Sequence, residues 1–292
     1  MRVRAVAEEN LRDLEKEGWV DWSRRPFRDG AVLWVPVKPT EPCDCEIAEQ
    51  PRYRGRGFFL IGDIAVVHGE RPSSDEIRQI VSCRHPRGLL WLRELRDVTR
   101  TPVAEVLWGE SCEVSHRESG YTYILDPGKV MFSQGNREEK MRVAGQVRAG
   151  AGDERIADMF AGIGYFSIPL AGAGARVHAM EINPVAFGYL NRSVEANGLT
   201  GRITPSLGDC RELLDGVYDR IVMGHFDAPA LFPDALKHVR SGSVLHVHSL
   251  GSAREQIEAD LACAGFSATI QVHMVKKYRP HVWHMVQDVC IG

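Results

Sequence analysis

The sequence lacks the features by which a chain enters or crosses a membrane. None of its apolar runs approaches the roughly 18 to 20 uninterrupted residues that a membrane-spanning helix needs. The N-terminus carries Arg2, Arg4, Glu8 and Glu9 where a signal peptide would have an apolar stretch. We therefore expect neither a membrane protein nor a secreted protein.

Cysteines are few, and their spacing is irregular. The seven cysteines are odd in number and lie at positions 43, 45, 83, 112, 210, 263 and 290. Such a set does not make a disulfide framework and is typical of a reducing cytoplasm. Cys43 and Cys45 form only a C-x-C, and no second pair follows at the spacing of a zinc site. We expect no metal.

A strong net charge is also absent, since 36 basic residues face 39 acidic ones and leave −3. The chain therefore has no overall basic character to attract nucleic acid. Local basic runs do occur beside aromatic residues, at 52–56 around Tyr53 and at 84–100 around Trp91. This mixture suits phosphate contact and base stacking, although taken alone it more often indicates solvated faces.

From about residue 153 onward, short β-branched runs alternate with amphipathic stretches of helical length. This rhythm predicts an α/β, Rossmann-like domain with a mostly parallel sheet. The predicted strands are 155–159, 175–181, 203–207, 219–223, 243–249, 268–275 and 282–289, and the predicted helices are 165–171, 184–197, 228–238 and 253–264. The last two strands leave no room for a helix between them, which predicts an antiparallel hairpin at a sheet edge.

The first part of the chain is less regular and predicts a smaller α+β region. A helix is predicted at 71–81, a loop at 36–51, and strands at 32–37, 58–67, 104–107, 111–116 and 121–125. We expect an N-terminal region over 1–126 and a second domain over 127–292.

The sharpest motif is Asp158-Met159-Phe160-Ala161-Gly162-Ile163-Gly164, where a strand ends in an acid and a glycine-rich turn leads into a helix. Glycines there let the backbone approach a ligand closely. The next strand ends in Glu181, whose carboxylate could accept both ribose hydroxyls of an adenosine. Asp209 follows the third strand and could meet the adenine amino group. The three acids therefore predict a nucleoside site at the carboxyl ends of the strands.

The nucleoside could belong to a dinucleotide or to S-adenosylmethionine. A dinucleotide site favours a third glycine and a free helix N-terminus for the pyrophosphate, whereas this chain has bulky Tyr165 and Phe166 followed by Ser167. An acid directly before the loop also suits an ammonium better than a pyrophosphate. These features favour S-adenosylmethionine over NAD(P).

These motifs resemble those of a known family, which contains both tRNA guanine-N1-methyltransferases and wybutosine-synthesising aminocarboxypropyltransferases. The resemblance rests on 129–136, 139–142, the 158–164 loop and Met223-Gly224-His225, and it covers about 101 to the C-terminus. The tail 276–284, Lys-Lys-Tyr-Arg-Pro-His-Val-Trp-His, is similar to the archaeal-type aminocarboxypropyl branch. The resemblance implies a class I methyltransferase fold, S-adenosylmethionine as donor, and the purine 3′ of the anticodon as target. It also implies that 1–126 supplies tRNA contacts and that 127–292 is the catalytic domain.

The resemblance also implies site residues. By motif position, donor contacts fall on Ser133, Lys140, Glu181, Asp209 and Cys210, to which the loop adds Asp158, Phe160 and Gly162. Relatives usually carry arginine where this chain has Lys140, and lysine loses the forked grip on a carboxylate.

Four further residues have alternative interpretations. Cys210 resembles a nucleophile, but a backbone amide role beside the adenine-contacting acid is favoured. His246 and His248 alternate on a predicted strand, so one is expected to face the core and the other the crevice, although ordinary packing is the favoured interpretation of this pair. His225 ends the fourth strand, where related enzymes position the acceptor base, and is expected to act in catalysis together with Lys140.

The predicted reaction is transfer of the 3-amino-3-carboxypropyl group to a wyosine-type base, with phenylalanine tRNA as the expected partner and a monomer as the expected state. Methylation of guanine N1 and a catalytically silent tRNA-binding protein remain as alternatives. Methyltransferase relatives usually carry an arginine at the position of Gly135, and an asparagine and proline at the strand end occupied by Gly224 and His225. Space at the two glycines is expected to admit a rotated methionine arm, with its carboxylate near Lys140.

Overall fold

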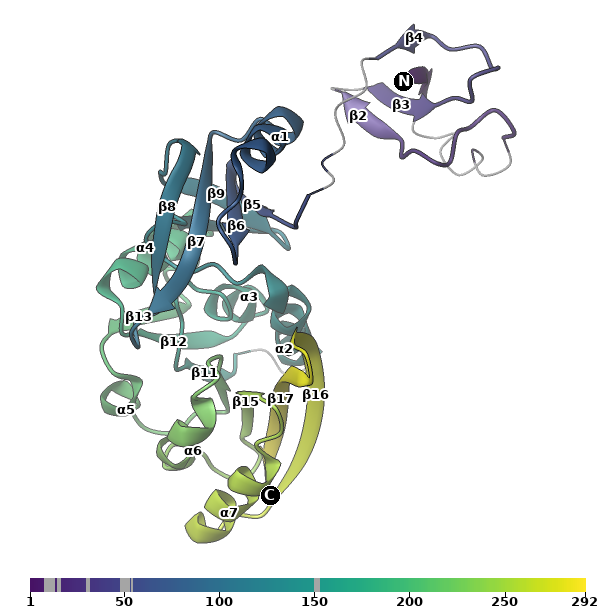
Figure 1. Ribbon diagram of the computed structural model, residues 1–292. Coiled ribbons are helices and arrows are strands. Elements are labelled where there is room, and N and C mark those ends of the chain that lie inside the picture. The colour runs from purple at the N-terminus through teal and green to yellow at the C-terminus, as the bar shows by residue number, and fades with distance from the viewer. Residues whose placement is uncertain (8–13, 15–16, 30–31, 48–52, 54, 150–152) are drawn as a thin grey trace. The chain divides into compact units, whose positions relative to one another are not determined.

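The computed structural model describes residues 1–7, 14, 17–29, 32–47, 53, 55–149 and 153–292. It divides into two compact units, one formed by 1–55 with 78–85 and the other by 56–77 with 86–292. Figure 1 shows the chain with its elements labelled. Arg52 and Arg54, which belong to the first basic run, lie outside the described residues. In the part of the chain that the structure describes, no helix is long and apolar enough to span a membrane.

The first unit contains a small antiparallel sheet. Its strands are β1 (Arg2–Val6), β2 (Phe27–Asp29), β3 (Val32–Pro36) and β4 (Cys45–Glu46), in the order β2-β3-β1-β4. Val3 and Val35 are fully buried in it, and Leu14, Val20 and Leu33 pack around them. The short strand β4 interrupts the loop predicted at 36–51. Helix α1 (Ser74–Arg84) confirms the predicted helix, shifted toward the C-terminus.

The second unit begins with two small sheets. The first is formed by β5 (Phe59–Ile61), β6 (Ile64–His68), β7 (Gly88–Arg96) and β8 (Thr101–Gly109), and the second by β9 (Val114–Glu118) and β10 (Tyr121–Leu125). The single strand predicted at 58–67 is wrong, because Gly62 adopts a positive φ of 57° and turns the chain into a hairpin. Strand β7 was not predicted, because Arg93 and Arg96 place it within the basic run at 84–100.

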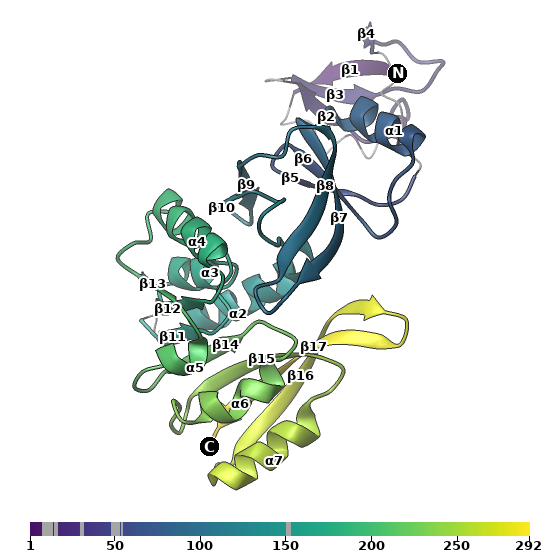
Figure 2. The same ribbon diagram turned by 60° about the vertical axis from the view of Figure 1, so that its left-hand side comes forward.

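The large sheet of the second unit has seven strands in the order β13-β12-β11-β14-β15-β17-β16. They are β11 (Arg155–Asp158), β12 (Arg176–Glu181), β13 (Ile203–Leu207), β14 (Arg220–Met223), β15 (Val244–Leu250), β16 (Ala268–Arg279) and β17 (Val282–Ile291). The first five in this order run parallel, whereas β17 is antiparallel to β15 and pairs with β16 in a hairpin. Figure 2 shows this hairpin in yellow beside β15. The predicted Rossmann-like sheet and its edge hairpin are confirmed.

Helices pack on both faces of this sheet because successive strand residues point to opposite sides. Ile156 belongs to one buried apolar cluster with residues of α3 (Ser167–Gly172) and α4 (Pro184–Ala196). Ala157 belongs to the other, with residues of α6 (Ala228–Leu236) and α7 (Arg254–Ala264). Helix α4 starts as predicted, with Pro184 in its first turn and the Asn183 side chain accepting from the amides of Val185 and Ala186.

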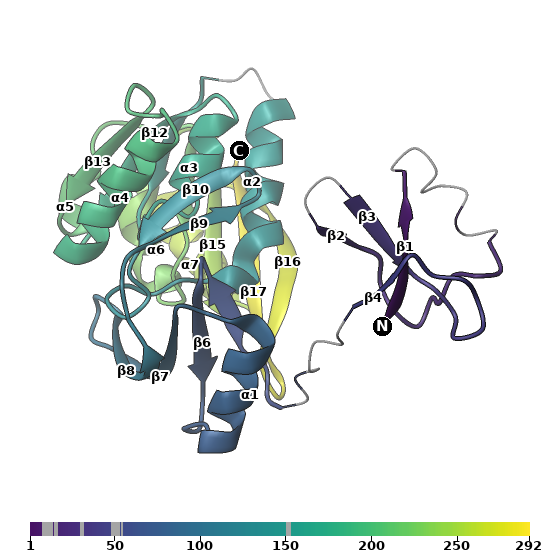
Figure 3. The same cartoon turned by 90° about the horizontal axis from the view of Figure 1, so that it is seen from above.

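Two helices were not predicted, α2 (Arg137–Ala149) and the short α5 (Cys210–Leu213). Helix α2 is polar, and charged contacts join it to the sheet, beside which it lies in Figure 3. Arg142 bonds Asp288 of β17 at 2.6 Å, and Asp288 in turn bonds His246 of β15 at 2.6 Å. Val143 and Val147 of α2 are also buried in the apolar cluster that contains Ile156, so apolar packing and charged contacts together hold this helix.

The expectation that His246 and His248 point in different directions is wrong. Residues two apart on a strand share a face, and both imidazoles are 0% exposed. His246 bonds Asp288, and His248 Nδ1 lies 2.9 Å from His284 Nε2. Neither histidine lines the crevice described below.

Candidate active site

A crevice opens at the carboxyl ends of β11, β12 and β14, on the second unit. It consists of two cavities of about 200 and 390 Å³. Both are lined by Val98, Phe160, Glu181, Ile182 and His225. Open α/β sheets bind their ligands at this edge, so the fold brings these residues to the expected place.

Glu181, the last residue of β12, lies where the two cavities meet. Its Oε2 accepts from the Gly162 amide at 2.7 Å, and its Oε1 accepts from the Asn183 amide at 2.7 Å. Burial raises the pKa of the carboxyl above its ordinary value, and this effect outweighs that of the two amide hydrogen bonds, which lower the pKa. Each oxygen keeps a further lone pair for a hydroxyl, so the carboxylate fits the two ribose hydroxyls of S-adenosylmethionine.

Asp158 holds the glycine-rich loop in place through hydrogen bonds. This carboxylate is 0% exposed, and its Oδ2 accepts from the Ser167 hydroxyl at 2.6 Å and from the Ser167 amide at 3.1 Å. Gly162 has a φ of 58°, and a Cβ there would meet the Tyr165 ring. Phe160 and Gly162 line the crevice, whereas Asp158, also expected to contact the donor, lines neither cavity. In this structure Asp158 holds the loop that faces the donor.

Asp158→Asn is expected to remove one component of the pH dependence of stability. Burial raises the pKa of Asp158 to about 6. Because the pKa of Asp158 is higher in the folded state than in the unfolded state, the folded protein binds the proton more tightly, and protonation of Asp158 stabilises the fold. This stabilisation is complete below about pH 4 and is lost as the pH rises through 6. The free energy of unfolding of the wild type, minus that of the variant, should fall by on the order of 2 kcal/mol between pH 4 and 7. Urea titrations across this range measure it, and a constant difference would contradict the shift.

Asp209 and Cys210 lie together in the larger cavity, at the start of α5. Asp209 caps that helix by accepting from the Arg211 amide at 2.9 Å, and its carboxylate pairs with the Arg211 guanidinium at 2.5 Å. This side-chain hydrogen bond lowers the pKa of Asp209. Burial raises the pKa of the Cys210 thiol to about 11. The thiol is therefore protonated at neutral pH and is not activated as a nucleophile.

Lys140 and Ser133 line the smaller cavity. Lys140 is 2% exposed, and its ammonium pairs with Glu118 of β9 at 2.5 Å. Three aromatic rings surround the ammonium, with centroids 5.2 to 5.7 Å from Nζ, and they belong to Tyr123, Phe132 and Tyr165. Sequence reasoning missed Glu118, because nothing local connects a strand residue to a helix residue 22 positions later.

His225 faces both cavities and stacks on Phe160, with ring centroids 5.3 Å apart. The Asp227 amide donates to His225 Nδ1 at 3.2 Å. Burial, followed by the charge of Arg100, lowers the pKa of the imidazole. A neutral ring that accepts at Nδ1 carries its proton on Nε2, so His225 is arranged to donate a hydrogen bond into the crevice.

Further residues of the smaller cavity were not singled out as site residues. They are Arg100, in the loop between β7 and β8, Asn136, in the short 3₁₀ helix η3 (Gln134–Asn136), and Lys276 and Tyr278 of β16. Asn136 lies in the motif at 129–136, and Lys276 and Tyr278 lie in the motif at 276–284. These motifs were the sequence features from which the three site residues could have been predicted. In the described residues, no group of three His, Cys, Asp or Glu side chains could hold a metal ion.

The expectation of open space is wrong at Gly135, whereas Gly224 lines the smaller cavity. A Cβ at Gly135 would overlap Lys276 Nζ and lie 3.0 Å from its Cδ. A Cβ at Gly224 would lie 3.2 Å from the Phe166 ring. A cation from another element therefore fills the place beside Gly135, whereas Gly224 forms part of the cavity wall.

Comparison with known proteins agrees with this geometry. The TRM5/TYW2 methyltransferase domain family matches residues 114–276, more than half of the chain. The tRNA(Phe) (4-demethylwyosine(37)-C(7)) aminocarboxypropyltransferase of Methanocaldococcus jannaschii is 36% identical over 247 residues, covering 80% of this chain and 97% of that protein. The enzyme of the same name from Pyrococcus horikoshii is 34% identical over 202 residues, covering 65% and 72%.

Solved structures show the same fold. Trm5b from Pyrococcus abyssi superimposes with a TM-score of 0.75 at 27% identity, covering 99% of both chains. TYW2 of M. jannaschii, solved with AdoMet, gives 0.64 at 28% identity over 81% of this chain and 99% of that chain. The class I S-adenosylmethionine-dependent methyltransferase fold and the family resemblance are both confirmed, and this chain belongs to the TRM5/TYW2 methyltransferase family.

Proposed function

We propose that this chain is a transferase that moves the 3-amino-3-carboxypropyl group of S-adenosylmethionine to a wyosine-type tricyclic base, 3′ of the anticodon in tRNA. The observation that carries the proposal is the 36% identity across 97% of a relative whose name states this reaction. The crevice supports it, because Glu181 fits the donor's ribose and the smaller cavity continues from Glu181 toward Ser133 and Lys140.

The donor supplies a sulfonium, which makes the methionine Cγ electrophilic. Attack by a ring carbon of the base forms a C–C bond and breaks the S–Cγ bond, whose electron pair stays on sulfur in 5′-methylthioadenosine. The base releases one proton. Since the leaving thioether is neutral, no acid has to protonate it, and the protein acts mainly by orientation and charge placement.

The side chains of the crevice divide this work. We assign donor binding to Glu181 and Asp209, with Phe160, Gly162 and Cys210 around them and Ser133 in the smaller cavity. Lys140 keeps the cavity wall in place through its pair with Glu118. His225 donates from Nε2 to an oxygen or nitrogen of the acceptor base. His225 is therefore a positioning donor in this proposal, and the proton released by the base goes to water.

The partner is tRNA, and we propose phenylalanine tRNA, a monomeric enzyme and a cytoplasmic location. Residues 1–126 contribute phosphate contacts, and 127–292 hold most of the donor site. Within the basic run at 84–100, Arg87 pairs with Asp63 and Arg96 pairs with Glu94. Arg93 lies over the Trp91 ring, 5.6 Å from its centroid. A cation beside an exposed ring edge suits phosphate and base contact together.

Methylation of guanine N1 in the same tRNA is the second candidate. One observation favours it, namely the TM-score of 0.75 with Trm5b over nearly the whole of both chains. The two reactions share the donor and the crevice and differ in the carbon that is transferred.

We expect the spent donor to be 5′-methylthioadenosine. The measurement is one incubation of tRNA bearing the tricyclic base with donor labelled differently in its methyl and carboxyl carbons, followed by chromatography and mass spectrometry of the RNA. Carboxyl label should enter the tRNA, and methyl label should not. Methyl label in the RNA together with S-adenosylhomocysteine would replace the proposal by the second candidate, and no label in the RNA would leave a silent tRNA-binding protein.

A further inference from the structure

The smaller cavity contains cations that no carboxylate neutralises. Among the described residues, neither Lys276 nor Arg100 takes part in an ion pair, whereas Lys140 is paired with Glu118. Arg100 lies instead over the Phe226 ring, 5.8 Å from its centroid. An unpaired cation in a half-buried place is costly unless an anion binds there. The cavity is therefore prepared for a negative group.

A β-bulge aims Lys276 into this cavity. Along β16, His273 pairs with Val286 of β17, and Lys276 pairs with His284, with a register shift between Met274 and Lys276. Val286 and His284 are two apart and share a face, so His273 and Lys276 share it too, although they are three apart. One extra residue in the bulge turns Lys276 to the face that carries the buried His284.

Gly135 and Lys276 are a matched pair. The ammonium of Lys276 stands where a side chain at position 135 would begin, so any residue larger than glycine would displace it. The adjacent Asn136 lines the cavity, and its Oδ1 is buried without a hydrogen-bond partner among the described residues. A buried polar atom without a partner indicates a missing ligand group. One end of the cavity thus offers a cation beside an unused acceptor.

A cation beside an acceptor complements the carboxylate and ammonium of an α-amino acid. We propose that Lys276 binds the α-carboxylate of the donor's methionine arm and that Asn136 Oδ1 accepts from its α-ammonium. This assigns the carboxylate to Lys276 in place of Lys140, whose charge Glu118 already neutralises at 2.5 Å. The assignment rests on the proposed function, since holding this end of the arm positions its Cγ for attack.

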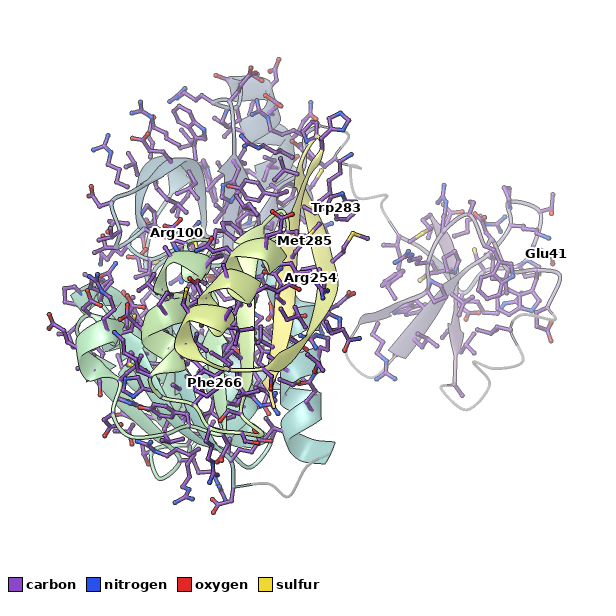
Figure 4. The ribbon with its side chains drawn as sticks, turned by 90° about the horizontal axis from the view of Figure 1, so that it is seen from below. Glu41, Arg100, Arg254, Phe266, Trp283 and Met285 are labelled. Carbon is purple, nitrogen blue, oxygen red and sulfur yellow. The ribbon has the colours of Figure 1, made fainter. Side chains whose placement is uncertain are left out.

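The surroundings favour a small anion over a phosphate of the RNA chain. Lys276 is half-buried, and it lines a cavity of about 200 Å³ together with Ser133, Asn136 and Tyr165. Burial, and then the charges of Lys140 and Arg100, lower the pKa of Lys276, and a bound carboxylate would offset both effects. The exposed cation of the same hairpin is Lys277, which pairs across the strands with Trp283 on the opposite face. Trp283 is labelled near the tip of the hairpin in Figure 4.

The test compares three ligands on purified protein by calorimetry. They are S-adenosylmethionine, its decarboxylated form, which lacks only the carboxylate, and 5′-methylthioadenosine, which lacks the whole arm. Lys276→Met should weaken the binding of S-adenosylmethionine at least tenfold and leave the affinities for the other two ligands within about twofold of the wild-type values. Lys276→Arg should restore part of the loss, and the matched control Lys277→Met should bind all three ligands as the wild type does.

Gly135→Ala gives a second variant that leaves the lysine in the chain. It should weaken the binding of S-adenosylmethionine as Lys276→Met does. The double variant should bind S-adenosylmethionine no more weakly than either single variant, because both substitutions remove the same contact. Equal loss for all three ligands, or wild-type binding of S-adenosylmethionine with weakened tRNA binding, would overturn the proposal. These are binding measurements, so they stand apart from the labelling experiment, in which the proposed function itself is tested.

Discussion

Glu181→Ala is expected to weaken binding of S-adenosylmethionine at least hundredfold. A carboxylate that accepts two ribose hydroxyls makes two charge-assisted hydrogen bonds, each worth about 1.5 to 3 kcal/mol. The same carboxylate accepts from the amides of Gly162 and Asn183, both at 2.7 Å, so its loss also releases the loop that faces the donor. Calorimetry on the folded variant measures the affinity.

Two further variants sharpen the Glu181 prediction. Glu181→Gln should weaken binding nearly as much, because both oxygens accept from backbone amides and an amide NH₂ would set a donor against one of them. Glu195→Ala, at an exposed position on α4 that lines neither cavity, should leave the affinity unchanged. Wild-type affinity in a folded Glu181→Ala protein would mean that the donor binds elsewhere.

Glu118→Ala should destabilise the fold by about 3 to 5 kcal/mol, since it leaves a buried ammonium without its counter-charge. Lys140 is 2% exposed and Glu118 is 8% exposed, so water does not replace the lost partner. Burial lowers the pKa of Lys140 while Glu118 raises it, so without the carboxylate only the effect of burial remains. Urea denaturation at pH 7 measures the change in the free energy of unfolding.

The double variant Glu118→Leu with Lys140→Met is the control for this pair. Replacing both charges by apolar groups of similar size removes the desolvation cost together with the attraction, so it should recover most of the stability lost in the single variant. Arg192 and Glu113 form an exposed pair, and Glu113→Ala should cost less than about 1 kcal/mol. A Glu118→Ala protein no less stable than Glu113→Ala would show that water reaches Lys140.

Local patterns in the sequence predict much of the fold of the catalytic domain. Alternating β-branched runs and amphipathic stretches placed all seven strands of the large sheet, because strand and helix periods are properties of neighbouring residues. Glu181 and Asp209 end or follow such strands, so the position of the crevice followed from strand order. The prediction lacked α2, in which only a few apolar residues such as Val143 and Val147 stand among polar ones, and β7, which lies within the basic run at 84–100.

The tertiary structure alone decided which charges meet. The sequence by itself determined a crevice at Glu181, since a strand end and a glycine turn are local features. It did not determine that Glu118 neutralises Lys140, nor that Lys276 stands over Gly135, 141 positions earlier in the chain. Both pairings depend on long-range packing, and the second depends on a one-residue bulge, which turns Lys276 to the face that carries His284.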